Sequence, residues 1–179
     1  MSSYTATFKI CIFGDGGVGK TALTRRYVTN RFEVDTKITI GVDILVKDVD
    51  VENIRVKLQI WDFGGEERFR FFLPIYARGS SGGIFMYDIT RLSSLNNLDE
   101  WLSVFKEKLG VEEKKIPILL VGGKKDLSDD NSVSKKYAMQ FALSRGIYDI
   151  IECSAKTGEN VEKIFETIVY KILKNIELI

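Results

Sequence analysis

The chain alternates short apolar runs with amphipathic stretches, and this pattern predicts βαβ units around a mostly parallel sheet. The expected strands are residues 8–13, 42–49, 54–61, 83–89, 116–121 and 148–153. The expected helices are residues 20–30, 94–109, 134–145 and 161–173. Residues 116–121 (IPILLV) are apolar throughout, which is typical of a strand that helices cover on both faces.

A short connection makes the predicted sheet mixed. Only Asp50-Val51-Glu52-Asn53 separates the strand at 42–49 from the strand at 54–61. Parallel neighbours need a long crossover, so these two strands are expected to form an antiparallel hairpin.

Composition narrows the class of protein. The 179 residues fit one domain of ordinary size, residues 1–179, without repeats or linkers. Lys and Arg number 26 and Asp and Glu 25, which argues against a nucleic-acid binder or a polybasic membrane patch. Histidine is absent, and this excludes imidazole-based acid/base chemistry and zinc sites that need imidazole.

Several features together predict a cytoplasmic protein. Cys11 and Cys153 each lie in an apolar run, so both are expected to be buried thiols in a reducing compartment. No apolar run approaches the ~18 residues of a membrane span. The polar start MSSYTAT does not resemble a signal peptide.

Residues 14–21, GDGGVGKT, match the phosphate-loop pattern G-x-x-x-x-G-K-[ST] in full. The octad follows a predicted strand and opens a predicted helix, so backbone N–H groups and the helix N-terminus would face phosphate oxygens. Lys20 would contact the β- and γ-phosphates, and the Thr21 hydroxyl would bind Mg²⁺. The motif fits ATPases and kinases as well as GTPases.

A second motif, D-x-x-G, follows the strand at 54–61. Asp62 stands at the carboxyl end of that strand, where a carboxylate can hold the metal of a phosphate-loop enzyme. Gly65 has no Cβ, so its backbone N–H can approach a γ-phosphate. The motif is weak alone and becomes specific in combination with the phosphate loop.

As a set, the motifs resemble the Ras superfamily of small GTPases, most closely Rab proteins. The segments that carry the resemblance are KICIFGDGGVGKTALTRRY, ITIGVDI, KLQIWDFGGEERFR, LLVGGKKDL and ECSAKTGENVEKIF. They cover essentially the whole chain in the family's order and spacing. The resemblance implies a guanine-nucleotide switch with the α/β P-loop NTPase fold: a six-stranded, mostly parallel sheet with one antiparallel strand, flanked by five helices.

The resemblance also implies site residues. Thr39 would be the switch I threonine that ligates Mg²⁺ beside Thr21 and Asp62, Gly65 the switch II glycine, and Phe32 the aromatic residue packed on guanine. The expected nucleotide contacts are Asp15, Gly16, Gly17, Val18, Gly19, Lys20, Thr21, Ala22, Phe32, Thr39, Gly65, Lys124, Asp126, Leu127, Ser154, Ala155 and Lys156.

The base is expected to be guanine. Asp126 can accept hydrogen bonds from both N1–H and the 2-amino group of guanine, a pair of donors that adenine lacks. The Lys124 stem can cover the base, and by resemblance the Ala155 N–H reaches guanine O6. Gly123 departs from the family, which carries Asn there. That departure bears on nucleotide affinity and exchange more than on the choice of base.

Glu66 departs from the family as well, because most relatives carry a glutamine that positions the attacking water. With Lys20 and Gly65, Glu66 completes the expected catalytic set. An ionised carboxylate can accept a proton but cannot donate to a phosphate oxygen. Its repulsion from a neighbouring negative charge is about 4 kcal/mol at ~4 Å and a dielectric of about 20. The two effects oppose one another, and the hypothesis is that Glu66 still orients or activates water.

The segment after Asp62 is unusually aromatic. Phe63 and Gly64 replace small residues typical of relatives, which adds a bulky ring and a more pliable backbone. Phe69, Phe71 and Phe72 follow. These rings either pack beneath switch II or form a state-dependent apolar patch for a partner.

Partners are expected by resemblance only: an effector, an exchange factor and a GTPase-activating protein. Trp61 and Tyr76 match two members of the aromatic trio of Rab effector surfaces, but Ile44 replaces the third. The end LKNIELI carries no cysteine for prenylation. Membrane association is therefore expected only through a partner or a tail absent from this sequence.

The sequence thus predicts a Rab-like GTPase that binds GTP and GDP with Mg²⁺ and hydrolyses GTP. No arginine finger is evident, and Lys37 is the nearest cation in switch I, so slow turnover of roughly 10⁻⁴ to 10⁻² s⁻¹ is expected. One alternative is a nucleotide-bound interaction module without hydrolysis, suggested by Gly123 and Glu66. Another is a phosphate-loop kinase or ATPase, which would leave Asp126 without a role.

Overall fold

A mixed β-sheet forms the centre of the protein, seen in a computed structural model that describes residues 6–34, 37–110 and 115–179. Its strand order is β2-β3-β1-β4-β5-β6. The strands are β1 (Ala6–Phe13), β2 (Val42–Val51), β3 (Ile54–Phe63), β4 (Gly82–Asp88), β5 (Ile118–Gly123) and β6 (Ile150–Glu152). The β2–β3 pair is antiparallel and every other neighbouring pair is parallel, which confirms the expected hairpin and mixed sheet.

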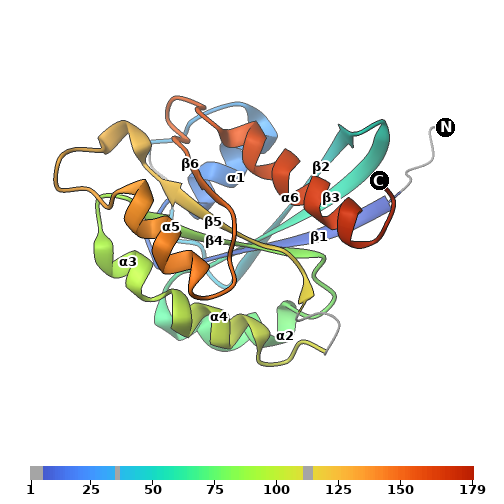
Figure 1. Cartoon of the computed structure of the whole chain (residues 1–179), viewed down its shortest axis with the longest axis horizontal. Coiled ribbons are helices and arrows are strands. Elements are labelled where there is room, and N and C mark those ends of the chain that lie inside the picture. Colours follow the sequence, from blue (N-terminus) through green and yellow to red (C-terminus); the bar gives the residue numbers. More distant parts are fainter. Residues whose placement is uncertain (1–5, 35–36, 111–114) are drawn as a thin grey trace.

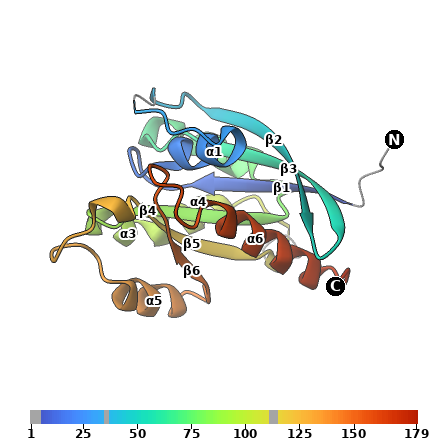
Figure 2. The same cartoon turned by 90° about the horizontal axis from the view of Figure 1, so that it is seen from above.

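Helices cover both faces of the sheet (Figures 1 and 2). They are α1 (Lys20–Thr29), α2 (Leu73–Tyr76), α3 (Leu92–Asn96), α4 (Leu98–Lys106), α5 (Lys135–Leu143) and α6 (Val161–Asn175). Short 3₁₀ helices η1 (Glu67–Phe72) and η3 (Lys125–Leu127) lie in loops. With α3 and α4 counted as one interrupted helix, the described residues contain five α-helices, as the resemblance implies. The expected α/β fold is confirmed.

Two apolar clusters hold these layers together. On one face, α1 and α6 pack against the sheet, and the Tyr27 ring stacks on Phe165 with centroids 3.8 Å apart. On the other face, α2 to α5 pack against the sheet, and Phe13 of β1 stacks on Phe105 of α4 at 4.6 Å. Strands β1, β4 and β5 lie between the two clusters, and their middle residues are buried on both sides.

The predicted helix at 94–109 is wrong in its bounds and continuity. It begins earlier, at Leu92, is interrupted at Asn97, and ends at Lys106. Asn97 has a weak helical propensity, and its side chain donates a hydrogen bond to Asp15 in the loop after β1. This contact accompanies the break between α3 and α4.

Several strand ends also differ from expectation. The last strand is only Ile150–Glu152 because β5 pairs with these three residues alone. The strand expected at 116–121 instead runs from Ile118 to Gly123, and β4 begins and ends one residue early. Both cysteines are buried as expected, and burial raises the pKa of Cys11 to about 11 and that of Cys153 to about 12. Among the described residues, no helix has the length and apolar character needed to span a bilayer.

The stack of Phe105 on Phe13 should carry much of the stability of the α4 face. Phe105→Ala leaves a cavity against a rigid sheet, and we expect the free energy of unfolding to fall by about 3–5 kcal/mol. Leu143→Ala, at the exposed end of α5, should cost less than about 0.5 kcal/mol. Urea unfolding at fixed nucleotide and magnesium concentrations measures both. Equal losses in the two variants would contradict this assignment of the core.

Candidate functional site

Two adjoining cavities lie at the carboxyl ends of the parallel strands, where β1 lies between β3 and β4. The chain passes from β1 to a helix on one face of the sheet, and from β3 and β4 to helices on the other face. The first cavity, of about 290 Å³, lies between the β1–α1 loop and the loops around Thr39 and Gly65. The second, of about 420 Å³, lies between the same β1–α1 loop and the loops after β5 and β6. Gly17, Gly19 and Ala22 line both, so the two cavities form one elongated site.

The β1–α1 loop passes so close to β4 that its first residue must be glycine. Gly14 has a φ of +142°, and a Cβ there would lie 2.2 Å from the Met86 carbonyl oxygen. Gly19, at φ +104°, turns the chain into α1. The loop therefore wraps around the cavity with its backbone rather than with side chains, as a phosphate-binding loop requires.

Lys20 places a buried ammonium in the first cavity. The residue is only 5 % exposed, and its Nζ donates to the carbonyl oxygens of Gly14 and Asp15, each at 2.7 Å. Burial lowers the pKa of Lys20 to about 8, although the nearby carboxylates of Asp62 and Asp15 act in the opposite direction. A buried cation that is bonded only to neutral carbonyls is a strong site for an anion.

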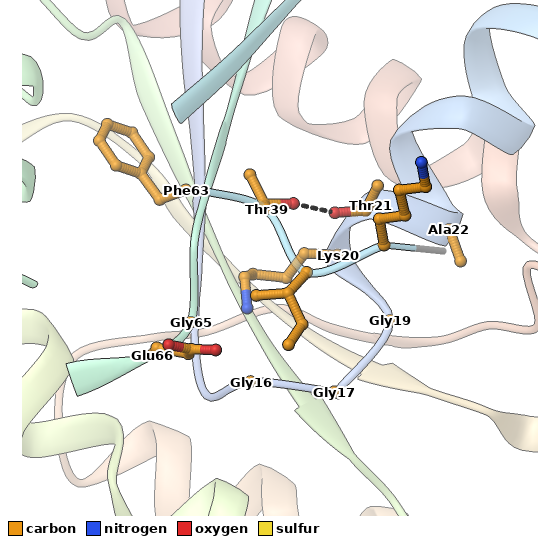
Figure 3. A pocket seen from close by; sticks show the side chains of 12 residues that line it. Gly16, Gly17, Gly19, Lys20, Thr21, Ala22, Thr39, Phe63, Gly65 and Glu66 are labelled. Atoms are coloured by element: carbon orange, nitrogen blue, oxygen red, sulfur yellow. Dashed lines mark hydrogen bonds between the residues drawn. The ribbon is translucent and has the colours of Figure 1, made fainter. Parts of the chain in front are cut away.

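Three oxygen ligands from separate segments meet beside Lys20, and Figure 3 shows two of them, the Thr21 and Thr39 hydroxyls. The Thr21 hydroxyl donates to Asp62 Oδ2 at 2.5 Å and lies 2.7 Å from the Thr39 hydroxyl. Asp62 is fully buried, and burial raises its pKa to about 6. Its other oxygen, Oδ1, has no hydrogen-bond partner among the described residues. The predicted metal set is thus brought together.

This donor set fits Mg²⁺. Hydroxyl and carboxylate oxygens are the ligands that this hard cation takes, usually beside phosphate oxygens and water. A cation at the unpartnered Asp62 Oδ1 would also compensate a buried charge. In the described part of the chain no three His, Cys, Asp or Glu side chains gather around a common point, so a metal enclosed by such side chains alone is not supported there.

Glycines also allow two segments to approach the phosphate loop closely. By the family resemblance, the segment around Thr39 is called switch I and the segment around Gly65 is called switch II. A Cβ on Gly65 would lie 2.4 Å from the Asp15 carbonyl carbon and 2.5 Å from Lys20 Nζ. A Cβ on Gly64 would lie 2.4 Å from the Thr39 carbonyl oxygen, and the Gly64 N–H donates to the Gly41 carbonyl at 2.8 Å. Gly64 therefore permits a tight contact between switches I and II.

The aromatic segment divides between interior and surface. Phe63 is buried against α2, and the Phe69 ring edge lies 3.1 Å from the ideal Cβ position of Gly64. Phe71 is 63 % exposed and contacts the Phe72 ring at 3.9 Å between centroids. Phe63 and Phe69 thus support switch II from within, whereas Phe71 projects from it.

The second cavity contains the predicted base-binding residues. Asp126 Oδ1 accepts a hydrogen bond from the Ser154 hydroxyl at 2.6 Å, which orients the carboxylate. Lys124 is held by Asp88 at 2.8 Å. Burial acts to raise the pKa of Asp88, but hydrogen bonds from Lys124 and Thr90 outweigh it and lower that pKa. The remaining predicted wall residues also line this cavity: Val18, Phe32, Leu127, Ala155 and Lys156.

Gly123 leaves a space that a methionine fills. An ideal Cβ on Gly123 would lie 2.4 Å from Met86 Cε and 3.0 Å from the Val18 carbonyl oxygen. Met86 Cε also lies 3.4 Å from the ideal Cβ position of Gly19. By the family resemblance, an asparagine amide at this position would link the loop after β5, here called the base loop, to the phosphate loop. In this protein an apolar methyl group packs there instead.

A sequence model of the Ras family matches residues 9–174. The chain belongs to the Ras family.

Curated relatives place it near Rab proteins. The chain is 38 % identical over 171 residues to the GTP-binding protein ypt3 of Schizosaccharomyces pombe, covering 96 % of this chain and 78 % of ypt3. It is 39 % identical over 173 residues to the human Ras-related protein Rab-30, covering 97 % of this chain and 83 % of Rab-30. It is also 39 % identical to the Ras-related protein RABA2a of Arabidopsis thaliana, over 95 % of this chain and 78 % of RABA2a. The predicted resemblance to Rab-like small GTPases is confirmed.

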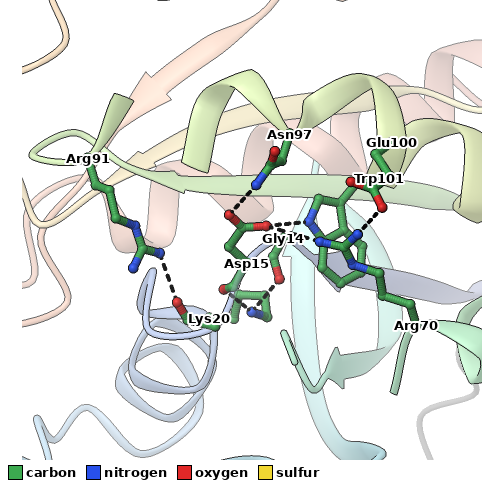
Figure 4. A network of polar contacts seen from close by, with 9 residues as sticks. Gly14, Asp15, Lys20, Arg70, Arg91, Asn97, Glu100 and Trp101 are labelled. Carbon is green, nitrogen blue, oxygen red and sulfur yellow. Dashed lines mark hydrogen bonds and ion pairs between the residues drawn. The ribbon is translucent and has the colours of Figure 1, made fainter. Parts of the chain in front are cut away.

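One part of this Ras-family site escaped the sequence analysis. The Asp15 carboxylate accepts hydrogen bonds from Asn97 Nδ2 and from the buried Trp101 Nε1, each at 2.7 Å (Figure 4). Arg70 of switch II lies 3.7 Å from the same carboxylate, stacks over the Trp101 ring and pairs with Glu100 of α4. The phosphate loop is thereby fastened to α4 and, through Arg70, to switch II.

A second missed contact joins Arg91 to the phosphate loop, where its guanidinium donates to the Gly16 carbonyl at 2.8 Å. None of these partners could be found from local pattern, since more than eighty residues separate Asp15 from Asn97 and Trp101. The only available signal was the charged residue at the second position of the phosphate loop, which needs partners once it is partly buried.

The two tryptophans provide a matched test of this anchorage. Trp101→Phe removes a donor to a carboxylate, and we expect the free energy of unfolding to fall by about 1.5–3 kcal/mol. Trp61→Phe is the control, because Trp61 Nε1 has no hydrogen-bond partner among the described residues and no hydrogen bond is lost. Chemical unfolding at constant nucleotide and Mg²⁺ compares them. A smaller loss in Trp101→Phe than in Trp61→Phe would show that Asp15 does not depend on this bond.

Proposed function

We propose that this Rab-like small GTPase, acting as a single domain, binds GTP and GDP with Mg²⁺ and hydrolyses GTP to GDP and phosphate. The observation that carries the proposal is the meeting of Thr21, Thr39 and the partly unpartnered Asp62 beside the buried ammonium of Lys20. Three parts of the chain that are distant in sequence supply what a triphosphate and its cation need.

In this proposal the first cavity holds the phosphates. Lys20 turns its N–H donors from the loop carbonyls to the β- and γ-phosphates, and the amides of residues 15–22 surround them. Thr21, Thr39 and Asp62 would hold Mg²⁺, which when bound offsets phosphate charge. Gly65 would donate its N–H to the γ-phosphate from its position against the phosphate loop.

The second cavity would hold the base. Asp126, oriented by Ser154, accepts the two guanine donors, and the Lys124 stem and Phe32 cover the faces of the ring. Ala155 supplies a backbone N–H, with Leu127 and Lys156 completing the wall. Ionised Asp126 would be left unpaired by adenine, so this carboxylate carries most of the discrimination.

Hydrolysis proceeds by in-line attack of water on the γ-phosphorus, with Lys20, Gly65 and Glu66 as the catalytic set. Positioning and charge neutralisation supply nearly all of the rate enhancement. The output is a switch: the γ-phosphate orders the two loops that meet at Gly64 and Gly41, and its loss releases them.

We further propose a cytoplasmic protein regulated by an exchange factor and a GTPase-activating protein and read by an effector. Association with membranes would come through a partner or a lipidated tail. The support is family membership and the exposed apolar side chains of both switches, among them Phe71, Ile38 and Ile40. Nucleic acid is not an expected partner, because the net charge is only +1.

Two measurements test the central proposal. Denaturing the purified protein should release a guanine nucleotide, and added GTP should yield phosphate only when Mg²⁺ is present. Guanine nucleotide without phosphate release would instead favour the interaction module without hydrolysis. Adenine nucleotide, or equal competition by ATP, would favour the kinase or ATPase and overturn the proposal.

Asp126→Asn tests the base contact. The amide presents a donor where guanine also donates but suits the 2-oxo group of xanthine, so we expect GTP affinity to fall by about 100-fold or more while xanthosine triphosphate affinity rises. Asp129→Asn, in the same loop outside the cavity, should leave both affinities unchanged. Competition against a fluorescent GDP measures them. Retained preference for GTP in Asp126→Asn would disprove the base assignment.

Removing Mg²⁺ tests the proposed metal ligands. Excess EDTA should speed GDP release by about tenfold or more, since a tenfold change needs the loss of only about 1.4 kcal/mol of the stabilisation that Mg²⁺ gives to bound GDP. In Thr21→Ala the acceleration should fall below about threefold because part of the metal site is already lost. Thr29→Ala, at the exposed end of α1, should respond like the parent protein. An unchanged EDTA response in Thr21→Ala would exclude Thr21 as a ligand.

A further inference from the structure

The most unusual feature of the cavity is an acid beside the position proposed for the γ-phosphate. Glu66 lines the first cavity together with Lys20 and Gly65 (Figure 3). A glutamine at this position could accept a hydrogen bond from water and donate one elsewhere, whereas a carboxylate only accepts. An uncompensated carboxylate would also repel the triphosphate.

The charge of Glu66 is compensated within switch II. Arg68 Nε lies 2.5 Å from Glu66 Oε2, two residues further along the chain in η1. The Arg68 guanidinium lies 4.8 Å from the Phe69 ring centroid, and Phe69 in turn packs beside Gly64. The guanidinium is therefore placed by the same aromatic segment that supports the contact between the switches.

The other charged groups near Glu66 do not replace Arg68. Lys20 is buried and donates to the loop carbonyls, and Lys37 lines the cavity from switch I. Glu67 is exposed and does not line the cavity. The ion pair itself contributes little to folding, because the Arg68 side chain is 67 % exposed and such pairs are screened. The ion pair should therefore change the electrostatic potential in the first cavity rather than the free energy of unfolding.

We propose that Glu66 and Arg68 form a dyad that orients the attacking water without the negative charge of a lone carboxylate, as a neutral glutamine amide would. Glu66 accepts a hydrogen bond from the attacking water, and Arg68 acts as a positioning residue that holds the carboxylate and neutralises it. The dyad rests on the proposed GTP hydrolysis, and Arg68 is the group that makes an acidic residue compatible with that reaction.

The chemical step balances without a further reactant. The water oxygen forms a bond to the γ-phosphorus, and the bond from that phosphorus to the β–γ bridging oxygen breaks with its electron pair remaining on GDP. The proton lost by water passes to the Glu66 carboxylate and leaves with the phosphate product. Arg68 neither gains nor loses a proton in this step.

A double-mutant cycle tests the dyad by single-turnover GTP hydrolysis. Arg68→Ala should lower the rate about tenfold, the equivalent of about 1.4 kcal/mol, while the Kd for a fluorescent GTP analogue changes less than about twofold. In the Glu66→Gln background the same Arg68→Ala change should alter the rate less than about twofold, because the amide supplies both functions. Arg68→Lys, which keeps the charge, should recover the rate to within about threefold of the parent.

Glu67→Gln is the matched control, since it removes one negative charge from the same 3₁₀ helix and should leave the rate unchanged. Equal losses from Arg68→Ala in the parent and Glu66→Gln backgrounds would show that Arg68 acts independently of Glu66, which overturns the dyad. So would an unchanged rate in Arg68→Ala, or a loss that Arg68→Lys fails to recover. A parent protein that binds guanine nucleotide but releases no phosphate overturns the proposed hydrolysis together with the dyad, whereas the other outcomes overturn the dyad alone.

Discussion

The structure depends on one buried charge, the ammonium of Lys20. Desolvation disfavours this cation, and its two carbonyl acceptors compensate it only in part. An anion brought to the cavity therefore gains an interaction that water cannot match. The close packing of Gly65 against the phosphate loop and the buried Asp62 surround the same point, so the proposed phosphate and metal sites and switch II share one electrostatic centre.

Two departures from the family sequence, Gly123 and Gly64, are accommodated by different contacts of neighbouring atoms. Where an asparagine would link the base loop to the phosphate loop, Gly123 and the Met86 methyl provide packing without a hydrogen bond. Packing is less directional than a hydrogen bond, so this contact should fix the relative orientation of the two loops less firmly. At Gly64, a smaller side chain allows the Thr39 carbonyl to approach, and the switches meet through backbone atoms.

The phosphate loop is also held from outside the nucleotide cavity. Asp15 presents its carbonyl to Lys20 and its carboxylate to Trp101 and Asn97, so one residue connects the ligand side to α4. Arg70 extends this connection to switch II. Movement of switch II thus changes the surroundings of a charged group in the phosphate loop, a physical route between the two segments.

The sequence by itself determined the strand pattern, the hairpin and the phosphate loop, because these follow from hydrophobic periodicity, loop length and spacing within short motifs. Other residues that line the cavities, among them Thr39, Phe32 and Ala155, were expected only from the family resemblance. Only the tertiary structure decided the break at Asn97, the role of Gly64, the anchoring of Asp15 and the pairing of Arg68 with Glu66. Most of these depend on the distance between atoms from different elements, and the ion pair depends on how η1 turns two nearby side chains toward each other. Local pattern sets which face of an element is apolar, but it carries no measure of how closely two elements approach or which polar groups meet there.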